Sequence, residues 1–571
     1  MDQVSIPGRA KMKSDMRPEG LPSNSRLSVL KGAGTNQPIL ERHGEAVAVL
    51  ILACLFIGLY FRLPRMGDIW WMDAPRHALN GAFVLDFIAR MPFRHPVSFA
   101  YDYYRQWPAL TILFYPPLFY LSLAFSYALF GVSEASALFV EFTWFFLLAW
   151  GSFRLSRYWL GISGSLAVSI LLTAGHQLFF WGQQIMLDVP AYALVVWAAY
   201  FCLAYLKRGK ASSLMIGVIL AVLAVWTKYN AASFLVVFAL AFLLTRGPRL
   251  LRERAVIQAA AVGALLFIPA LVLFLTFGRY DLQQAYLPQH GLSSPFASFF
   301  FYAAIMPQIV SWPAVILAMV YVTVATVRPA YRIDRESTIF LIVWVVGTYV
   351  FYSTIAVKEP RHILMIGYPI VLAAVLAVDR TLRSYRWSGP TLLALCSAVL
   401  ASTIWHVRIP YVSGMRQAAQ VVARIAPHDT NVAIWCRYDG TFVFAMRAYA
   451  DRRDLGVVRL DKILFGKVAV SFARGYVQRR LDAAQISQDL AALHVQYVVF
   501  QSGYMENVRE VHQLEIALHS DKFTKVTAIP MHANYRFSPI TVLNVYQLKA
   551  AVPQVRVSPH IQIQMLGGKT I

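Results

Sequence analysis

The sequence predicts an α-helical polytopic membrane protein with a C-terminal α/β domain outside the membrane. Of its 571 residues, 58% are hydrophobic and only 14% are charged, and the mean hydropathy is +0.53. Ordinary soluble globular domains do not reach this composition. Apolar runs that approach the roughly 20 residues needed to cross a bilayer recur as far as residue 405. Beyond that point, short helix-like and strand-like segments alternate.

The positive charge of the chain fits a membrane protein better than a nucleic-acid-binding protein. The 52 Lys and Arg exceed the 29 Asp and Glu, which gives a formal net charge of +23. Most of these cations outside the C-terminal region lie in short clusters between apolar runs, where cytoplasmic anionic lipid and membrane topology account for them. We therefore predict a membrane partner and no nucleic acid.

The first residues and the cysteines add two further predictions. Residues 1–45 are polar and basic without an early apolar stretch, which predicts a disordered cytoplasmic tail followed by an uncleaved signal anchor at residues 46–63. The four cysteines lie far apart and form no CxxC pair. Neither a zinc knuckle nor a disulfide framework is therefore indicated.

Eleven apolar runs are predicted to cross the membrane. They are residues 46–63, 134–153, 160–180, 189–206, 212–227, 231–245, 255–277, 303–327, 338–356, 363–378 and 390–405. A twelfth run, residues 110–130, contains Pro116 and Pro117, which interrupt backbone hydrogen bonding near its start.

The basic clusters decide whether residues 110–130 cross. If this run does not cross and the N-terminus is cytoplasmic, five clusters fall on the cytoplasmic side, as the positive-inside tendency favours. They are Arg154/Arg157, Lys207/Arg208/Lys210, Arg246/Arg249/Arg252/Arg254, Arg328/Arg332/Arg335 and Arg380/Arg383/Arg386. We therefore predict a juxtamembrane or shallowly inserted helix at residues 110–130. Residues 46–405 then form a transmembrane domain with an external loop at 64–133, and residues 406–571 form an external α/β domain.

Ionisable residues gather on the predicted external side of the membrane. Asp73 lies in the first external loop, and Glu141 lies in the outer half of the second span. The others lie at external span ends or in short external links: Asp188, Lys228, Lys358 and Arg361. Such groups cost roughly 2.5 to 3.5 kcal/mol at a helix centre. Asp73 and Asp188 each precede a proline closely and are also suitable helix caps, and the cations can extend to lipid headgroups. The convergence of carboxylates and cations on one face favours a functional site over these structural alternatives.

This constellation suits the transfer of a sugar from a polyprenyl phosphate. A carboxylate takes the proton of the acceptor hydroxyl, and fixed cations hold the phosphate that leaves. The lipid tail of the donor needs a membrane. No nucleotide-binding loop is required, and the sequence contains no GxxxxGK[ST] and no convincing GxGxxG after a strand.

Five motifs extend this interpretation to a family. They are MDAPRHA in the first external loop, YPPLFYLSLAFSYALFGVSE before the second span, QQIMLDVP after the third, LAVWTKYN at the end of the fifth, and KEPRHILMIGYPIVL before the tenth. In this order, over residues 46–380, the sequence resembles the GT-C membrane glycosyltransferases. Among these it specifically resembles the bacterial family-39 group, which includes protein O-mannosyltransferases, the lipid A aminoarabinose transferase and RgtA/B/C/D-like galacturonosyltransferases.

The resemblance implies inverting transfer from an undecaprenyl- or dolichyl-phosphate sugar on the external face of the membrane. It assigns Asp73 and Asp188 as catalytic acids and places Lys358 and Arg361 in a basic link that faces the phosphate. We add Arg76, His77, Glu141 and Lys228 as candidate substrate-binding residues. Relatives usually carry Asp-Glu where this chain has Asp73-Ala74. The alanine removes one potential ligand for a divalent metal, so no cofactor is assigned and metal binding stays open.

The resemblance also implies a multi-pass protein of the bacterial inner membrane, with a lipid, a glycan or a protein as acceptor. Two other classes are considered. A transporter or lipid flippase usually carries ionisable groups at the midplane and inverted repeats, whereas here the acids lie at span ends and no repeat is visible. A catalytically degenerate GT-C scaffold is the second alternative, because of Ala74.

The C-terminal region predicts one small α/β domain. Helices are expected within residues 415–427, 486–494 and 508–520, and strands at 431–436, 495–500 and 541–548. Asp439 and Gly440 are expected in a structural turn between a strand and a helix.

Overall fold

A computed structural model describes residues 37–63, 67–278, 295–450, 452–468, 476–535, 540–549, 562–563 and 569–570. Most of the predicted cytoplasmic tail, residues 1–36, lies outside this range. The first helix, α1 (Gln37–Phe61), begins before the predicted anchor at residue 46.

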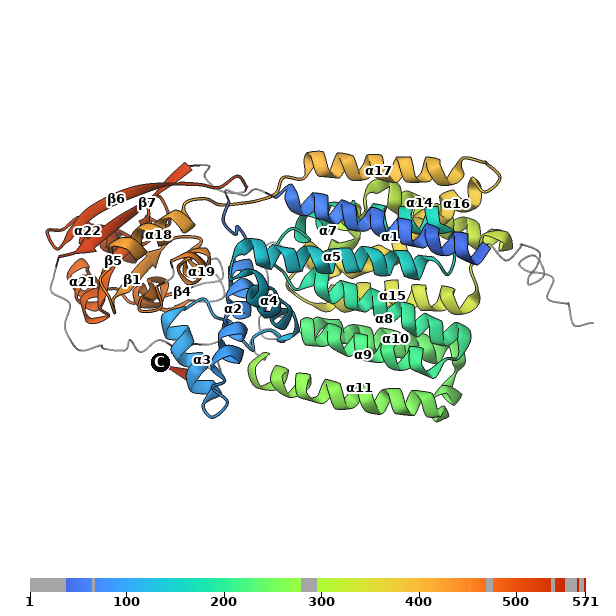
Figure 1. Ribbon diagram of the computed structural model, residues 1–571, viewed down its shortest axis with the longest axis horizontal. Helices are drawn as coiled ribbons and strands as arrows, with labels where there is room; N and C mark the ends of the chain where they lie inside the picture. Colours follow the sequence, from blue (N-terminus) through green and yellow to red (C-terminus); the bar gives the residue numbers. More distant parts are fainter. Residues whose placement is uncertain are drawn as a thin grey trace, which may run out of the picture. The chain divides into compact units, whose positions relative to one another are not determined.

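The apolar part of the chain forms a bundle of long helices. Figure 1 shows α5, α8, α9, α10 and α11 side by side with nearly parallel axes, and α8 packs against both α5 and α9. The bundle helices are α5 (Glu134–Ser156), α6 (Ile162–Thr173), α8 (Asp188–Arg208), α9 (Ala211–Thr227), α10 (Ala232–Arg246), α11 (Arg254–Leu273), α13 (Pro295–Val310), α14 (Trp312–Val327), α15 (Arg335–Thr354), α16 (Gly367–Thr381) and α17 (Ser388–His406). Short helical turns join them: α7 (His176–Trp181), η1 (Tyr229–Ala231), η2 (Pro248–Arg252), η3 (Phe274–Gly278), η4 (Pro329–Tyr331) and η5 (Pro360–Ile366).

The described residues contain eight helices long and apolar enough to cross a membrane, or nine if α13 and α14 form one bent span. Eleven were predicted. The run 160–180 divides at Gly175, where an added Cβ would lie 2.3 Å from the Ile309 carbonyl oxygen, so another part of the backbone crosses the chain there. This leaves α6 with 12 residues, and α9 has only 17. The α13–α14 pair bends by 110° at Ser311, which has φ of 80°.

Three helices precede this bundle in the first loop: α2 (Ala74–Arg90), α3 (Pro96–Gln106) and α4 (Leu118–Phe130). The helix α4 begins directly after Pro117, as the paired prolines predicted, and has 13 residues. At 1.5 Å per residue it is about 20 Å long, which is too short to cross the roughly 30 Å hydrocarbon core. The prediction that residues 110–130 do not form a full span therefore agrees with the structure.

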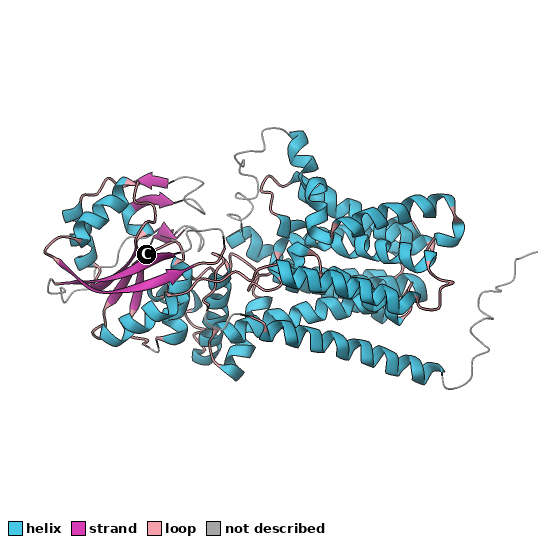
Figure 2. Ribbon diagram, turned by 90° about the horizontal axis from the view of Figure 1, so that it is seen from above, coloured by secondary structure: helices cyan, strands magenta, loops and turns pink. Residues whose placement is uncertain are grey.

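The C-terminal region contains a five-stranded sheet in the order β2-β1-β5-β7-β6. Strand β1 (Asn431–Trp435) is parallel to β2 (Gly456–Arg459) and β5 (Val495–Gln501), and β7 (Ile540–Leu548) is antiparallel to β5 and β6 (Phe523–His532). Figure 2 shows the strands gathered in this part of the chain, outside the helical bundle. Smaller pairs are β3 (Phe465–Val468) with β4 (Tyr476–Gln478), and β8 (Gln562–Ile563) with β9 (Lys569–Thr570).

The helices of this region are α18 (Met415–Ile425), α19 (Asp439–Tyr449), α20 (Asp461–Leu464), α21 (Ala483–Ala492) and α22 (Arg509–Leu518). Alternate residues of β1 and β5, such as Ala433 and Val498, pack in an apolar core with α21 and α22. The predicted helices and strands are confirmed within a few residues. The sequence did not predict β2 or β6. Asp439, which was expected in a turn between a strand and a helix, is the first residue of the helix α19.

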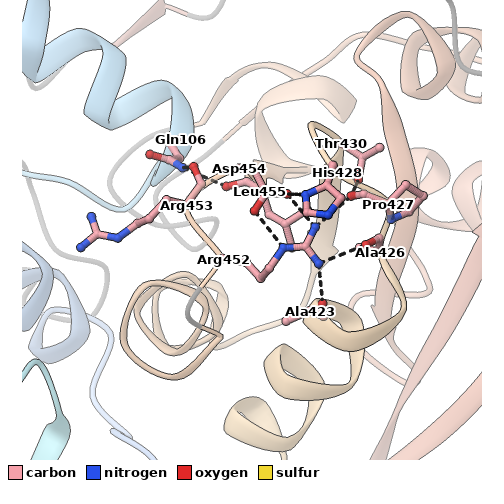
Figure 3. A network of polar contacts seen from close by, with 10 residues as sticks. All are labelled: Gln106, Ala423, Ala426, Pro427, His428, Thr430, Arg452, Arg453, Asp454 and Leu455. Atoms are coloured by element: carbon pink, nitrogen blue, oxygen red, sulfur yellow. Dashed lines mark hydrogen bonds and ion pairs between the residues drawn. The ribbon is translucent and has the colours of Figure 1, made fainter.

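A polar network fixes the turn before β2 (Figure 3). Arg452 donates to the carbonyl oxygens of Ala423 and Ala426 at the end of α18, at 2.9 and 3.3 Å, and pairs with Asp454 at 2.6 Å. Gln106 of α3 donates to the Leu455 carbonyl oxygen at 3.1 Å. The first-loop helices and the C-terminal domain are thus joined by hydrogen bonds.

Candidate active site

Asp73 immediately precedes α2 but does not cap it. It occupies the N-cap position, yet its side chain makes no capping hydrogen bond. Its Oδ2 instead accepts a hydrogen bond from Trp71 Nε1 at 3.3 Å and lies 3.4 Å from Arg361 Nη2. The side chain is 33% exposed. A carboxylate that is held by an indole and a guanidinium and still reached by solvent is available for chemistry.

Arg361 is the central cation of the site. It belongs to η5, and its side chain is only 10% exposed. Its Nε lies 2.5 Å from Glu359 Oε2, and its guanidinium faces the rings of Trp71 and Trp181 at 5.6 and 5.2 Å. Cation–π contacts of this kind strengthen when the cation is desolvated. The guanidinium is therefore fixed between two indoles, with a carboxylate on either side.

Asp188 and Lys228 form a second ion pair. Asp188 is the first residue of α8, and Lys228 directly follows α9. Lys228 Nζ lies 2.5 Å from Asp188 Oδ1; the Asp188 side chain is buried and that of Lys228 is largely so. Within the described residues, Asp188 Oδ2 has no hydrogen-bond partner. A buried carboxylate oxygen without a partner is costly unless a ligand or water meets it.

The two ion pairs belong to one electrostatic cluster. Asp188 interacts electrostatically with Arg361, to which Asp73 is also paired. His77 interacts with Asp73, Asp188, Lys228 and Arg361 together. The structure thus brings the two predicted acids to the same end of the helices.

Glu141 is fully buried in α5 and supports the loop before Asp188. Its Oε2 accepts a hydrogen bond from the Met186 backbone N–H at 3.3 Å, and Oε1 has no partner among the described residues. Met186 Sδ in turn lies 3.9 Å from Arg361 Nη1. Glu141 interacts electrostatically with Asp188. It therefore lies behind the site and holds the loop that carries it.

His77 is a buried, neutral member of the cluster. Its Nδ1 lies 3.0 Å from the Tyr120 hydroxyl, and the residue is 1% exposed. Burial lowers the pKa of His77 to about 4, although Asp73 opposes this shift. The imidazole is therefore uncharged near neutral pH and acts as a hydrogen-bonding group.

Two predicted cations are placed differently from Arg361. Lys358 Nζ donates to the carbonyl oxygens of Tyr352 and Ser353, at 3.0 and 2.7 Å, and faces the Tyr302 ring at 5.3 Å. Burial lowers the pKa of Lys358. Arg76 Nε donates to the Met72 carbonyl oxygen at 3.1 Å, and this half-buried side chain interacts electrostatically with Asp461 of the C-terminal domain. Lys358 therefore satisfies carbonyl oxygens at the end of α15, and Arg76 lies at the boundary with the C-terminal domain.

The structure adds residues that the sequence reasoning did not select. Glu359 lies beside Arg361 with a side chain that is 32% exposed, and although desolvation alone would raise the pKa of Glu359, the Arg361 charge holds that pKa below its usual range. The motif KEPRH contains this glutamate, so an acid two residues before Arg361 was a usable signal. Trp181 carried no such signal, because only the folded chain brings it to Arg361.

The described residues do not fit a metal site. No group of three or more His, Cys, Asp or Glu side chains among them gathers in a way that could hold a metal ion. The acids of the site are paired with Lys228 and Arg361 instead. We therefore derive no step through a metal.

Comparisons with known proteins bear on the fold and the family of the chain. The model of the family described as dolichyl-phosphate-mannose-protein mannosyltransferase matches residues 115–273. No curated protein matches the sequence. ArnT from Cupriavidus metallidurans, solved bound to undecaprenyl phosphate, aligns with TM-score 0.59 and 14% identity over 87% of this chain and 97% of that chain. Its apo state aligns with TM-score 0.60 over the same shares at the same identity.

A third solved structure shares the fold more distantly. The Archaeoglobus fulgidus oligosaccharyltransferase in its apo form aligns with TM-score 0.51 and 11% identity, over 80% of this chain and 69% of that chain. At these identities, the solved structures establish the fold alone.

The chain is a polytopic membrane protein with the GT-C glycosyltransferase fold. Within that class, the family-model match and the structural neighbours together support a PMT-like family, as the motifs predicted.

Proposed function

We propose that the protein transfers a sugar from a polyprenyl phosphate to an acceptor hydroxyl, with inversion at the sugar carbon. The observation that carries the proposal is the placement of Arg361 between Asp73, at 3.4 Å, and Glu359, at 2.5 Å, in the cluster that contains Asp188. A fixed, desolvated cation beside a reachable carboxylate matches the needs of phosphate departure and hydroxyl activation. ArnT, which shares the fold, has been solved with undecaprenyl phosphate.

Asp73 is the proposed base. The acceptor hydroxyl oxygen attacks the anomeric carbon, the bond from that carbon to the phosphate oxygen breaks, and the electron pair leaves with the polyprenyl phosphate. The hydroxyl proton moves to the Asp73 carboxylate, whose Oδ2 lies 3.4 Å from Arg361 Nη2, whereas Glu359 is held more closely, at 2.5 Å from Arg361 Nε. Asp73, Asp188 and Glu359 carry three formal negative charges against the two positive charges of Lys228 and Arg361, so uptake of one proton by Asp73 balances these five side chains.

Arg361 and Lys228 are the proposed phosphate-stabilising cations. Lys228 Nζ lies 2.5 Å from Asp188 Oδ1, so it can stabilise the phosphate only by contacting the phosphate and Asp188 together. In this proposal, Lys358 and Arg76 do not contact the phosphate. They stabilise the structure around the site, because Lys358 contacts the end of α15 and Arg76 interacts with the C-terminal domain.

We further propose that the site faces the periplasm of a bacterial inner membrane. Lys207 and Arg208 end the helix α8 that Asp188 begins, and Arg154 ends α5 at the end away from Glu134. Basic residues concentrate on the cytoplasmic side of membrane proteins. The opposite end, with the site and the C-terminal domain, is then external, where a lipid, glycan or protein acceptor is available.

The test uses the full-length protein in proteoliposomes that contain undecaprenyl-phosphate sugars labelled in the sugar. Release of undecaprenyl phosphate and transfer of label to an envelope-lipid or glycan fraction are measured for the wild type, Asp73→Asn and Asp188→Asn. We expect both variants to insert normally and to lose transfer. Wild-type turnover in both variants would overturn the proposal. Consumption of no labelled donor by the wild type would favour a degenerate scaffold.

A further inference from the structure

The segment that carries Asp73 is bound to the C-terminal domain before it reaches the site. We call residues 68–73 the acid-bearing segment. The Asp68 N–H donates to the Val412 carbonyl oxygen at 2.5 Å, and the Val412 N–H donates to the Asp68 carbonyl oxygen at 3.2 Å. The Asp68 Oδ2 accepts hydrogen bonds from the backbone N–H groups of Met415 and Arg416, at 3.0 and 3.1 Å.

This carboxylate therefore caps α18 from a distant part of the chain. Met415 and Arg416 are the first two residues of α18, whose N–H groups have no partner within the helix. A carboxylate is favoured there by both hydrogen bonding and the helix dipole. Asp68 is buried, and its Oδ1 also lies 3.6 Å from Arg416 Nε. The contact between Asp68 and α18 should resist opening, because a buried carboxylate that lost these hydrogen-bond donors would be strongly unfavourable.

The next two residues are held by the same domain. Thr441 of α19 donates its hydroxyl to the Ile69 carbonyl oxygen at 2.8 Å, in a buried position. The Trp70 ring lies 5.0 Å from the ring of Tyr535, which follows β6, and 5.2 Å from the ring of Trp71. Trp71 is the residue that donates to Asp73. Contacts thus run without a gap from the C-terminal domain to the candidate base.

The helix that follows Asp73 is fixed at its other end. Asp86 of α2 pairs with Arg447 of α19 at 2.7 Å and with Arg453 at 3.1 Å, and it accepts a hydrogen bond from the Tyr103 hydroxyl at 3.0 Å. Burial opposes ionisation of Asp86, but the two arginines hold its pKa below the usual range. Asp73 therefore lies between two anchored points rather than at the end of a free loop.

We propose that the C-terminal domain positions Asp73 for catalysis, and that Asp68 and Thr441 are its positioning residues. The kinetic part of this inference rests on the proposed function. Displacing a catalytic group by about 1 Å can cost on the order of 100-fold in rate. Loosening the acid-bearing segment should accordingly lower kcat while the donor KM, which depends on Arg361 and the lipid-facing surface, changes little.

The experiment compares Thr441→Val, Asp68→Ala and Asp68→Asn with the control Thr541→Val. Thr541 also donates a hydroxyl to a carbonyl oxygen, that of Ser502 at 2.7 Å, but both residues lie within the C-terminal domain. Hydrogen–deuterium exchange of peptides that cover residues 67–73 is measured on the full chain in nanodiscs, together with kcat and KM.

We expect faster exchange at residues 67–73 in Thr441→Val and more so in Asp68→Ala, with kcat lowered about 5-fold and 30-fold, respectively, from the loss of one hydrogen bond or of a hydrogen-bonded charge. Asp68→Asn keeps an acceptor oxygen and should recover most of the wild-type protection and rate. Thr541→Val should leave this peptide unchanged.

Unchanged exchange at residues 67–73 in both Thr441→Val and Asp68→Ala would overturn the inference, as would equal loosening in the Thr541→Val control. Loosened exchange with wild-type kcat would also overturn it. If Asp73→Asn retains full turnover, the proposed function fails, whereas the exchange result still reports whether the C-terminal domain holds the segment.

Discussion

The two ends of α8 carry the same kind of ion pair in opposite settings. At its start, Lys228 Nζ lies 2.5 Å from Asp188 Oδ1, and the side chains are 13% and 5% exposed. Near its end, Lys207 Nζ lies 2.6 Å from Asp334 Oδ2, and the side chains are 22% and 43% exposed. Distance therefore does not separate the two pairs, but burial does.

The two acids of these ion pairs also differ in their hydrogen bonds. Asp334 caps α15 and accepts from both the backbone N–H and the hydroxyl of Ser337, at 3.0 and 2.8 Å. Asp188 makes no capping contact of this kind, and its Oδ2 has no partner within the described residues. An acid whose oxygens are all occupied serves structure. A buried acid with an unused oxygen, beside Arg361, is suited to a substrate.

The largest difference should appear in turnover. Asp188→Asn removes the charge that faces Lys228 and Arg361, and we expect sugar transfer to fall about 10²- to 10³-fold, comparable with the loss of one transition-state contact. Asp334→Asn keeps a capping oxygen and should stay within about two-fold of wild type. Initial rates of polyprenyl phosphate release in proteoliposomes measure both. Equal losses of transfer rate in the two variants would contradict the assignment of Asp188 to the active site and of Asp334 to a structural role.

The second difference should appear in stability. Lys228→Met leaves a buried carboxylate without its partner, so we expect a loss of about 3 kcal/mol, whereas Lys207→Met at the exposed pair should cost less than about 1 kcal/mol. Thermal unfolding in one detergent, followed by a fluorescence reporter of buried cysteines, measures the pair of variants. Restoration of stability in the double variant Asp188→Asn/Lys228→Met would show that the unpaired charge is the cause.

The sequence predicted the fold class and much of the C-terminal domain because both depend on local patterns. Apolar runs and the alternation around Val495–Gln501 are readable residue by residue, and α18, β5 and α22 were found where predicted. The count of spans was less accurate. Gly175 and Ser311 break helices through contacts and backbone angles that hydropathy does not encode.

The candidate site was predictable in part for the same reason. Asp73, Asp188, Lys228 and Arg361 are polar residues at the ends of apolar runs, so their gathering followed from the order of the spans. Lys358 satisfied the same rule, yet its amino group donates to the end of α15. The direction of a side chain depends on packing between distant segments, which spacing alone does not determine.

A third comparison tests whether Arg361 acts through shape as well as charge. Arg361→Lys keeps one positive charge but loses the planar group that bridges Glu359 and Asp73 between two indoles. We expect transfer to fall about 100-fold, consistent with removal of a positioned transition-state contact. Arg154→Lys is the matched control at the other end of the bundle, because Arg154 also faces a ring, that of Tyr200 at 5.7 Å. Wild-type kinetics in Arg361→Lys would show that only the positive charge of this residue, and not its planar shape, is needed.

The smallest expected effect concerns His77, the buried titratable group of the site. Its pKa is about 4 in the folded protein against 6.5 for the ordinary side chain. Above pH 6.5 the imidazole is neutral in both states and contributes no pH dependence. As the pH falls from 6.5 toward 4, the unfolded chain binds the proton first, so the free energy of unfolding decreases.

Between pH 6.5 and 5, this difference should remove on the order of 1 to 2 kcal/mol. His77→Gln can keep a hydrogen bond to Tyr120 but cannot titrate, so its unfolding temperature should decline less over this interval than that of the wild type. The control His512→Gln, at an exposed side chain for which the described part of the chain shows no ion pair, should retain the wild-type slope. If His77→Gln and wild type decline in parallel, His77 is not the buried neutral group that the contact with Tyr120 indicates, and the pH dependence belongs to the carboxylates of the cluster.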